Sequence, residues 1–278
     1  MDEALTTPDY SERFLSTIAA FVTGDAAARG DEVELELTTR FGYALDFLRA
    51  CGTYLTLPGR RFLEVGSGTG NVVTAAAALG AVTTATDTMA QCVEITRERI
   101  AEHGLAAQVF QHDIRSAPLA PDGAFDFVFC YQVLEHMPRR DQFIALGRLM
   151  DLVAEGGHLF IDTENALCPF DRHDTQLWLP RILRPEHQSA LVRAFGKAID
   201  YYEPSFGGTV ELHDYLSYDE IVGAAGIKGF TVVNPFMPHR DGRQYARVVT
   251  GSDWLYDAIL KYIAFERFSP VALLLRKG

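Results

Sequence analysis

The sequence has no excess of basic residues and no long hydrophobic run, and each shortage excludes a class of protein. The 278-residue chain carries 25 basic against 37 acidic side chains, a net charge of −12. A surface this acidic repels phosphate backbones and anionic lipid headgroups. We therefore expect neither nucleic acid nor a membrane surface as a partner. Apolar stretches such as FDFVFC and VALLL are far shorter than the roughly 20 residues that span a bilayer.

Secretory features and cysteines are also scarce. The first residues, MDEALTTPDYSERF, are acidic and polar where a secretory signal has a basic start and an apolar run, so we expect no signal peptide and a cytoplasmic protein. The four cysteines lie some forty residues apart without a Cys-x-x-Cys pair. This spacing favours buried, reduced thiols over a metal site or a disulfide framework. The residues concerned are Cys51, Cys92, Cys130 and Cys168.

The amino-terminal part of the chain has a helical pattern. Hydrophobic residues make up 48% of the sequence, which excludes disorder and supports a sizeable core. Up to about residue 57 the apolar residues recur at helical spacing. We predict a first helix opened by Pro8, with Phe14, Ile18 and Phe21 on one face. A second helix is predicted through Leu37, Phe41, Leu45 and Leu48, and Pro58-Gly59 then breaks the chain.

From residue 61 onward, strands alternate with helices. Five short strands are predicted, apolar on both faces, which is typical of a parallel doubly wound sheet. They cover residues 61–65, 81–86, 107–111, 125–130 and 158–162. Helices separate them: one over 71–79 that Gly80 stops, one opened by a Thr88-x-x-Gln91 capping box, and one with Phe143, Leu146, Met150 and Val153 on one side.

Residues 163–212 interrupt this alternation with four prolines and six aromatic residues. We interpret them as an insertion. Beyond it, a Ser217-x-x-Glu220 capping box opens a helix that Gly226 ends. A strand at 230–234, a helix at 253–265 and a strand at 269–277 follow. The predicted domains are an N-terminal helical cap (1–57), a cofactor-binding half (58–162), a substrate lid (163–212) and a C-terminal part of the same α/β domain (213–278).

The sharpest motif is the run Leu63-Glu-Val-Gly-Ser-Gly-Thr-Gly70, a strand leading through three alternate glycines into a helix. Such a turn lets a ligand approach the backbone and points free amides at it; the alternative is a tight turn without a ligand. A dinucleotide fingerprint would place its third glycine at position 71, which is Asn71. Glu64 suits a cationic ligand such as an amino group or a sulfonium; alternatively it forms a salt bridge.

Two further carboxylates follow the next strands. Asp87 ends the second strand, where a carboxylate accepts both hydroxyls of a ribose, a role compatible with capping the next helix. Asp113 follows the third strand. Together with the backbone of Ile114 it is suited to the amino group and a ring nitrogen of an adenine; alone it would be a loop residue.

Taken together, these residues resemble a known family. LEVGSGTG, Asp87, Gln111-His-Asp-Ile114 and FDFVFCYQVLEHMP are similar to the successive motifs of class I S-adenosylmethionine-dependent methyltransferases, in particular a subgroup with a Val-Leu-Glu-His turn after the fourth strand. The resemblance is strong over about residues 60–162, holds in outline over 213–277, and does not extend to the N-terminal helices or the insertion. It implies a Rossmann-like sheet of seven mostly parallel strands whose last strand is antiparallel.

The resemblance also implies a set of cofactor contacts for S-adenosylmethionine and its product S-adenosylhomocysteine. The methionine part would lie against Glu64, Gly66, Ser67, Gly68 and Gly70. The ribose would bind Asp87, and the adenine Thr88 or Met89 together with Asp113 and Ile114. Cys130 and Gln132 would meet the amino-acid end.

We expect methyl transfer to a small molecule, with a hydroxyl oxygen as the acceptor. A base is optional, and His136, His173 (next to Asp174) and Glu164 are candidates; each is otherwise a structural or polar loop residue. A magnesium-assisted mechanism is rejected because Cys130-Tyr-Gln132 offers no carboxylate at the end of the fourth strand. The rivals are a nicotinamide-dependent oxidoreductase and a non-catalytic S-adenosylmethionine-binding module. The chain is expected to be a monomer or a homodimer.

Overall fold

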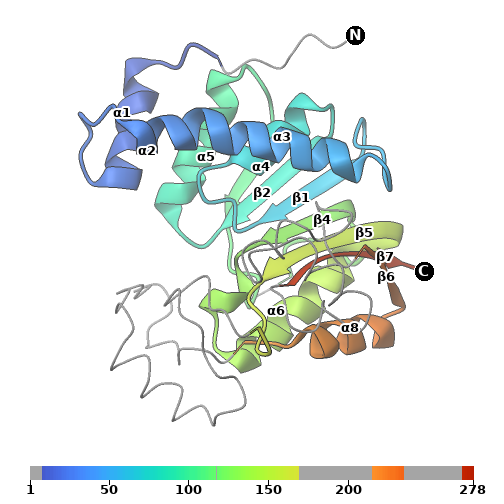
Figure 1. Cartoon of the computed structure of the whole chain (residues 1–278). Helices are drawn as coiled ribbons and strands as arrows, with labels where there is room; N and C mark the ends of the chain where they lie inside the picture. The colour runs from blue at the N-terminus through green and yellow to red at the C-terminus, as the bar shows by residue number, and fades with distance from the viewer. Residues whose placement is uncertain (1–7, 117, 169–214, 235–270) are drawn as a thin grey trace, which may run out of the picture. The chain divides into compact units, whose positions relative to one another are not determined.

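A single seven-stranded sheet organises the chain. The computed structural model describes residues 8–116, 118–168, 215–234 and 271–278 (Figure 1). In this part of the chain the strand order is β3-β2-β1-β4-β5-β7-β6. The parallel pairs include β1 with β2 and β2 with β3, whereas β7 runs antiparallel to β5 and β6. The predicted doubly wound sheet with an antiparallel last strand is therefore confirmed. Its strands are β1 (Arg61–Val65), β2 (Val82–Asp87), β3 (Gln108–Gln111), β4 (Phe125–Tyr131), β5 (Val153–Thr163), β6 (Phe230–Asn234) and β7 (Val271–Lys277).

The chain divides into two compact units, residues 1–129 and 130–278. In the first unit, α4 (Asn71–Ala78) packs on β1 and β2, and α5 (Ala90–Glu102) packs on β2 and β3. The N-terminal helices form a further layer, because α3 packs against α4 and α1 against α5 (Figure 1). These helices are α1 (Glu12–Thr23), α2 (Asp31–Glu34), the π-helix η1 (Leu35–Thr39) and α3 (Arg40–Cys51).

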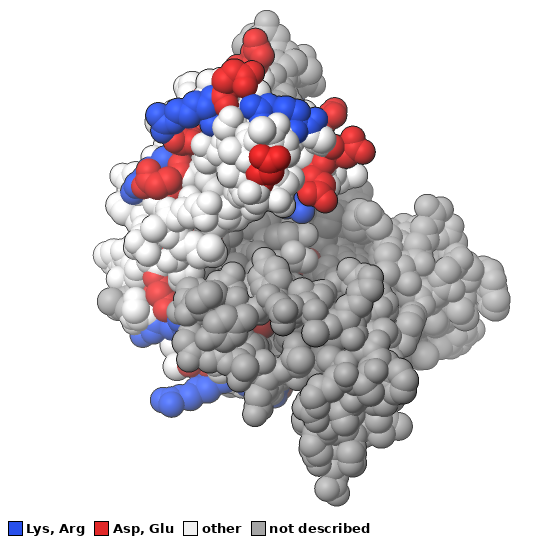
Figure 2. All heavy atoms as spheres, turned by 90° about the vertical axis from the view of Figure 1, so that its left-hand side faces the viewer, with Lys and Arg blue, Asp and Glu red and all other residues white. Residues whose placement is uncertain are grey.

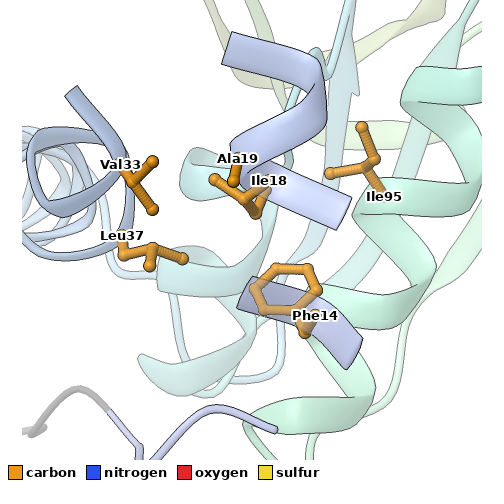
Figure 3. Packing of buried hydrophobic residues seen from close by; sticks show 6 residues of the cluster. All are labelled: Phe14, Ile18, Ala19, Val33, Leu37 and Ile95. Atoms are coloured by element: carbon orange, nitrogen blue, oxygen red, sulfur yellow. The ribbon is translucent and has the colours of Figure 1, made fainter. Parts of the chain in front are cut away.

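An apolar cluster joins the N-terminal helices to α5 (Figure 3). Phe14, Ile18 and Ala19 of α1 meet Val33, Leu37 and Ile95 there, and all six side chains are buried. Phe21 packs partly buried against this cluster, and Phe41, Leu45 and Leu48 are buried, so the predicted apolar faces of the first two helices are confirmed. Burial of such side chains stabilises each by roughly 1.5–3 kcal/mol, which attaches the N-terminal layer firmly to the sheet unit.

Two helix starts differ from the sequence expectation. The first helix begins at Glu12 and not at Pro8: the Ser11 side chain accepts a hydrogen bond from the Phe14 N–H, which satisfies a donor of the first turn. The Thr88-x-x-Gln91 capping box is also wrong, since Met89 is the N-cap of α5 and makes no side-chain cap. The Met89 N–H donates to Asp87 Oδ1 at 2.9 Å.

The second unit contains η2 (Leu134–His136, a 3-10 helix), α6 (Arg139–Leu152), α8 (Tyr218–Ile227) and strands β5, β6 and β7. The capping box of Ser217 and Glu220 is confirmed. Helix α8 ends at Ile227, just past the predicted Gly226, and Gly229 takes the left-handed conformation. Strand β5 begins at Val153, a residue expected on the preceding helix, because the backbone of Val153 is already extended, with a φ of −78° and a ψ of 129°. The strand continues across Gly156, which has a φ of 72°.

The described surface carries both signs of charge. Figure 2 shows acidic and basic side chains intermingled on one face. Arg13 pairs with Glu98, and Arg29 pairs with Glu12 at 3.0 Å. All four cysteines are buried, as predicted, and they form no disulfide bonds with one another. None of the helices in the described ranges has the length and apolar character that a bilayer crossing requires. The predicted helix over 253–265 and most of the insertion lie outside the described residues.

Candidate cofactor site

The glycine turn joins β1 to α4 as predicted. Gly66, Gly68 and Gly70 have φ values of 77°, 51° and 80°, a left-handed conformation that side chains with a Cβ rarely adopt. The surroundings of the last two glycines differ. A Cβ on Gly70 would lie 3.0 Å from atoms of Thr96, whereas a Cβ on Gly68 would meet nothing within 4 Å. Gly70 is therefore needed for packing against α5, and Gly68 leaves open space above the turn.

The backbone amides of this turn are mostly engaged within the protein, so the expectation of free amides is wrong. The N–H groups of Gly66 and Ser67 both donate to the Thr86 carbonyl, at 2.8 and 3.0 Å. The Gly68 N–H donates to Asp87 Oδ2 at 2.9 Å. The Gly70 N–H donates to the Ser67 carbonyl at 2.8 Å. Because these amides already have acceptors, the turn offers an open approach to the backbone and not a ring of donors for phosphate.

Glu64 lies beneath the turn and caps α4. Only 4% of the side chain is exposed. Oε2 accepts the Val73 N–H at 2.8 Å in the first turn of the helix, where a carboxylate is favoured. Burial raises the pKa of Glu64 well above its ordinary value, and the nearby charge of Asp87 adds to that rise. The salt bridge considered as an alternative is not among the ion pairs of the described residues. Contact with a cationic ligand stays a prediction.

Asp87 connects the glycine turn to the start of α5. Its Oδ2 accepts the Gly68 N–H and its Oδ1 accepts the Met89 N–H, both at 2.9 Å. These two bonds fix the orientation of the carboxylate at the carboxyl end of β2. The predicted bonds to ribose hydroxyls would use the remaining lone pairs of the same oxygens, and they stay a prediction.

The predicted adenine residues also lie in the first unit. The Thr88 carbonyl accepts a bond from Gln111 Nε2 at 2.9 Å. Asp113 forms an ion pair with Arg115 at 2.8 Å, and this hydrogen bonding lowers the pKa of the Asp113 carboxyl. Ile114 is buried. The Asp113 carboxylate is thus already paired with a cation, so contact with the adenine amino group would have to share it with Arg115.

The second unit contains the residues predicted for the amino-acid end of the cofactor. Cys130 is fully buried at the end of β4. Gln132 has a φ of 53° and is the one non-glycine residue with positive φ in the described ranges. Its N–H donates to the Asp162 carbonyl at 2.8 Å. Backbone strain of this kind is concentrated at functional sites, which supports a role for Gln132 while leaving the particular contact a prediction.

The candidate bases differ in burial. His136 ends η2 and is partly buried. Its backbone N–H donates to the Val133 carbonyl at 3.3 Å. Glu164 is fully buried directly after β5. His173 lies outside the described residues. In the described ranges no group of three or more His, Cys, Asp or Glu side chains is arranged to hold a metal ion.

Sequence reasoning missed the side chains that hold the turn from outside. Thr96 of α5 lies with its Oγ1 3.1 Å from Ser67 Oγ and 3.2 Å from the Gly68 carbonyl oxygen, to which it donates. The helical spacing of Thr96 with Val93 and Ile100 was the available signal. Glu36 and Arg99 contact the turn as well, and local sequence gave no indication that these distant residues meet there.

Comparison with known proteins supports the geometry. Residues 37–195, more than half of the chain, match a family model described as a methyltransferase domain. The chain belongs to this family. The methyltransferase domains of this type are enzymes that use S-adenosylmethionine as cofactor, and the match includes the whole glycine turn together with Asp87 and Asp113.

Individual relatives of this chain match it over a shorter stretch than the family model does. The ubiquinone biosynthesis O-methyltransferase of Xanthomonas campestris pv. campestris (strain B100) is 33% identical over 121 residues, which is 44% of this chain and 48% of that protein. The chain thus spans about half the length of this curated relative.

Two solved structures share the fold at low sequence identity. Magnesium protoporphyrin IX methyltransferase (ChlM) from Synechocystis PCC 6803, crystallised with SAH, superimposes with a TM-score of 0.53 at 16% identity, covering 94% of this chain and 93% of that one. The [4+2]-cyclase SpnF superimposes with a TM-score of 0.53 at 17% identity, covering 95% and 93%. Since one of these proteins is named a cyclase, the fold alone does not specify the reaction.

Proposed function

We propose that the protein transfers the methyl group of S-adenosylmethionine to a hydroxyl oxygen of a small molecule. The observation that carries this proposal is the glycine turn. Its amides are occupied by Thr86, Asp87 and Ser67, and two carboxylates, Glu64 and Asp87, flank it. Such surroundings leave a pyrophosphate without amide donors, and carboxyl oxygens suit a nucleoside that carries an ammonium and a sulfonium group.

The residues present fit this cofactor. The open position above Gly68 is space that a Cβ would fill, and Asp87 is held in place by two backbone bonds beside it. We propose that Glu64, Gly66, Ser67, Gly68 and Gly70 hold the methionine part, Asp87 the ribose, and Thr88, Met89, Asp113 and Ile114 the adenine. Cys130 and Gln132 remain proposed contacts of the amino-acid end. When bound, the cofactor supplies a methyl group that is already electrophilic.

The protein then has to orient the acceptor, exclude water and take up one proton. His136, His173 and Glu164 are the proposed acceptors of that proton. Oxygen is favoured as the acceptor atom because the curated relative is named an O-methyltransferase, although the match covers only about half of that protein. Residues 163–212 are proposed as the lid that selects the small-molecule acceptor.

The two rival functions predict different binding. A nicotinamide-dependent oxidoreductase requires the turn to accept a pyrophosphate, which the occupied amides disfavour. A non-catalytic binding module would bind the cofactor without transferring its methyl group, and membership of a methyltransferase domain family disfavours it.

Calorimetry with S-adenosylmethionine, S-adenosylhomocysteine and NAD tests the proposal. We expect binding of the first two and none of NAD. Methyl-labelled S-adenosylmethionine with a panel of phenols and aliphatic alcohols then tests transfer. Binding of NAD without any response to S-adenosylhomocysteine would refute the cofactor assignment. Cofactor binding without transfer to any member of the panel or to amine analogues would favour the binding module.

A further inference from the structure

A buried charged network joins the N-terminal helices to the glycine turn. Glu36 of η1 is 1% exposed, and Arg99 of α5 is fully buried. Their side chains form an ion pair, with Arg99 Nη2 3.3 Å from Glu36 Oε1. The second carboxylate oxygen of Glu36 accepts a bond from Arg40 Nη1 at 2.7 Å. The network lies wholly within the first unit.

The same carboxylate contacts the glycine turn directly. Glu36 Oε1 accepts hydrogen bonds from the Thr69 hydroxyl and, at 2.6 Å, from Asn71 Nδ2. Arg99 Nε donates to the Thr69 carbonyl at 2.7 Å. Thr69 is therefore held at its side chain by Glu36 and at its carbonyl by Arg99. Glu36 also holds Asn71, the first residue of α4, directly after the turn.

The position of Thr69 explains why such support is needed. It lies between Gly68 and Gly70, and glycine has more backbone freedom to lose on ordering than any other residue. Without external contacts, the peptide units around Thr69 would sample several orientations, and binding a ligand would include the cost of ordering them. Contacts that order the turn in the free protein therefore increase its affinity.

The backbone conformation and the packing around Glu36 hold this residue in place. Glu36 lies in a π-helical segment, an uncommon conformation that is frequent at functional sites. The neighbouring Leu37 packs into the apolar cluster of Figure 3, which holds the segment against α5. Arg99 also lies 5.5 Å from the centroid of the Phe14 ring in that cluster. The N-terminal layer is thus attached to α5 through the apolar cluster, and Glu36 contributes its contacts with Thr69 and Asn71.

We propose that Glu36 is a positioning residue of the cofactor turn, acting with Arg99 through Thr69 and Asn71. The N-terminal helices then determine the affinity of the turn as well as covering the sheet. This inference rests on the proposed function, because the affinity concerned is that for S-adenosylmethionine and its product. It also explains Asn71, whose amide side chain supplies the donor that glycine in a dinucleotide fingerprint would lack.

Two substitutions test the proposal without removing a whole side chain. Glu36→Gln keeps the shape and removes the charge, and Thr69→Val removes a single hydroxyl. Glu34→Gln is the matched control, since Glu34 lies two residues away and its side chain is exposed. The readouts are the Kd for S-adenosylhomocysteine, measured by calorimetry well below the unfolding temperature, and the hydrogen exchange of the Gly68 and Gly70 amides in the ligand-free protein.

We expect Glu36→Gln and Thr69→Val to raise this Kd at least about 10-fold and to speed exchange of both turn amides, while Glu34→Gln changes neither. The Kd of the double variant should stay close to that of the weaker-binding single variant and should not reach the product of the two separate effects. The reason is that both changes act on the same contact between Glu36 and Thr69. If Glu36→Gln does not fold, Thr69→Val carries the test.

The possible failures are distinguishable. If wild-type protein binds S-adenosylhomocysteine and both variants bind it equally well while unfolding at lower temperature, Glu36 only stabilises the fold and the inference is overturned. If wild-type protein does not bind it, the proposed function is overturned together with the cofactor role of Glu36. In that case the exchange data still show whether Glu36 orders the turn.

Discussion

Gly68 and Gly70 have the same left-handed backbone but different neighbours, and this difference separates binding from stability. Replacing either glycine with alanine incurs backbone strain of roughly 1–2 kcal/mol. Gly70→Ala adds a steric contact with Thr96 at 3.0 Å, which the tightly packed helix α5 would have to relieve. Gly68→Ala adds no contact within the protein.

We therefore expect Gly70→Ala to lower the free energy of unfolding by about 1–3 kcal/mol more than Gly68→Ala does. Gly68→Ala should lower the affinity for S-adenosylhomocysteine because its methyl group would occupy the space proposed for the cofactor. Urea unfolding and calorimetry on both variants measure this. Unchanged affinity in Gly68→Ala would show that the cofactor does not lie above Gly68.

His103 provides a prediction for pH. Burial and the charge of Arg99 lower the pKa of His103 to about 4, from an ordinary value of 6.5. Its Nε2 lies 3.0 Å from the Tyr10 hydroxyl oxygen, and its ring lies 4.7 Å from that of Phe41. Because the pKa of His103 is lower in the folded than in the unfolded protein, neutral His103 contributes to the free energy of unfolding above pH 6.5. This contribution is lost as the pH falls from 6.5 towards 4.

His103→Gln should therefore flatten the pH profile. At pH 7 the variant is expected to be less stable than wild type, because the ring contacts are lost. The difference in the free energy of unfolding should shrink as the pH falls from 6.5 to 4, and urea unfolding across this range measures it. Profiles that stay parallel would mean that the protonation of His103 is not linked to folding.

At the scale of elements, one of the two capping boxes predicted from local sequence formed and the other did not. Ser217 and Glu220 form the predicted capping box of α8, with Glu220 Oε2 2.8 Å from the Ser217 nitrogen. The Thr88 capping box did not form because α5 begins one residue later than predicted, with Met89 as its N-cap. The Met89 N–H donates to Asp87, whose carboxylate also accepts the Gly68 N–H of the glycine turn.

Ser217→Ala is expected to lower the free energy of unfolding by about 1 kcal/mol, since the Glu220 N–H loses its acceptor in the first turn of α8. Ser217→Asp, which retains an acceptor oxygen, serves as the control and should stay close to wild type. Chemical denaturation measures both. Equal losses in the two variants would show that the site requires the serine hydroxyl for another reason.

At the scale of the whole molecule, the proposal that residues 163–212 form a substrate lid can be tested independently of the cofactor site. A variant with His173→Ala and Trp178→Ala should bind S-adenosylhomocysteine normally and transfer methyl groups at least about 10-fold more slowly, since losing one positioned base alone costs 10²–10⁴-fold. Calorimetry and the labelled-methyl assay measure the two properties. Unaltered turnover with a changed oligomeric state, seen by size-exclusion chromatography, would instead assign the segment to assembly.

The sequence by itself determined the alternation of strands and helices, the place of the glycine turn and the fold class, because these depend on residues near one another in the chain. Hydrophobic periodicity, glycine spacing and the end of each strand are local properties. The antiparallel last strand and the cofactor were predicted from the resemblance of these motifs to a known family. The burial of the four cysteines as thiols was predicted from their spacing and from the composition of the chain.

Only the tertiary structure decided which groups bond to the glycine turn and to the carboxylates around it. It showed that the amides of Gly66, Ser67, Gly68 and Gly70 are already bonded, that Glu64 caps α4, and that Asp113 is paired with Arg115. It also brought Glu36 to Thr69 and Arg99, residues 33 and 63 positions further along the chain. The physical reason is that a hydrogen bond or a buried charge pair depends on distance in space, and the sequence around Glu36 is the same whichever partner the fold places beside it.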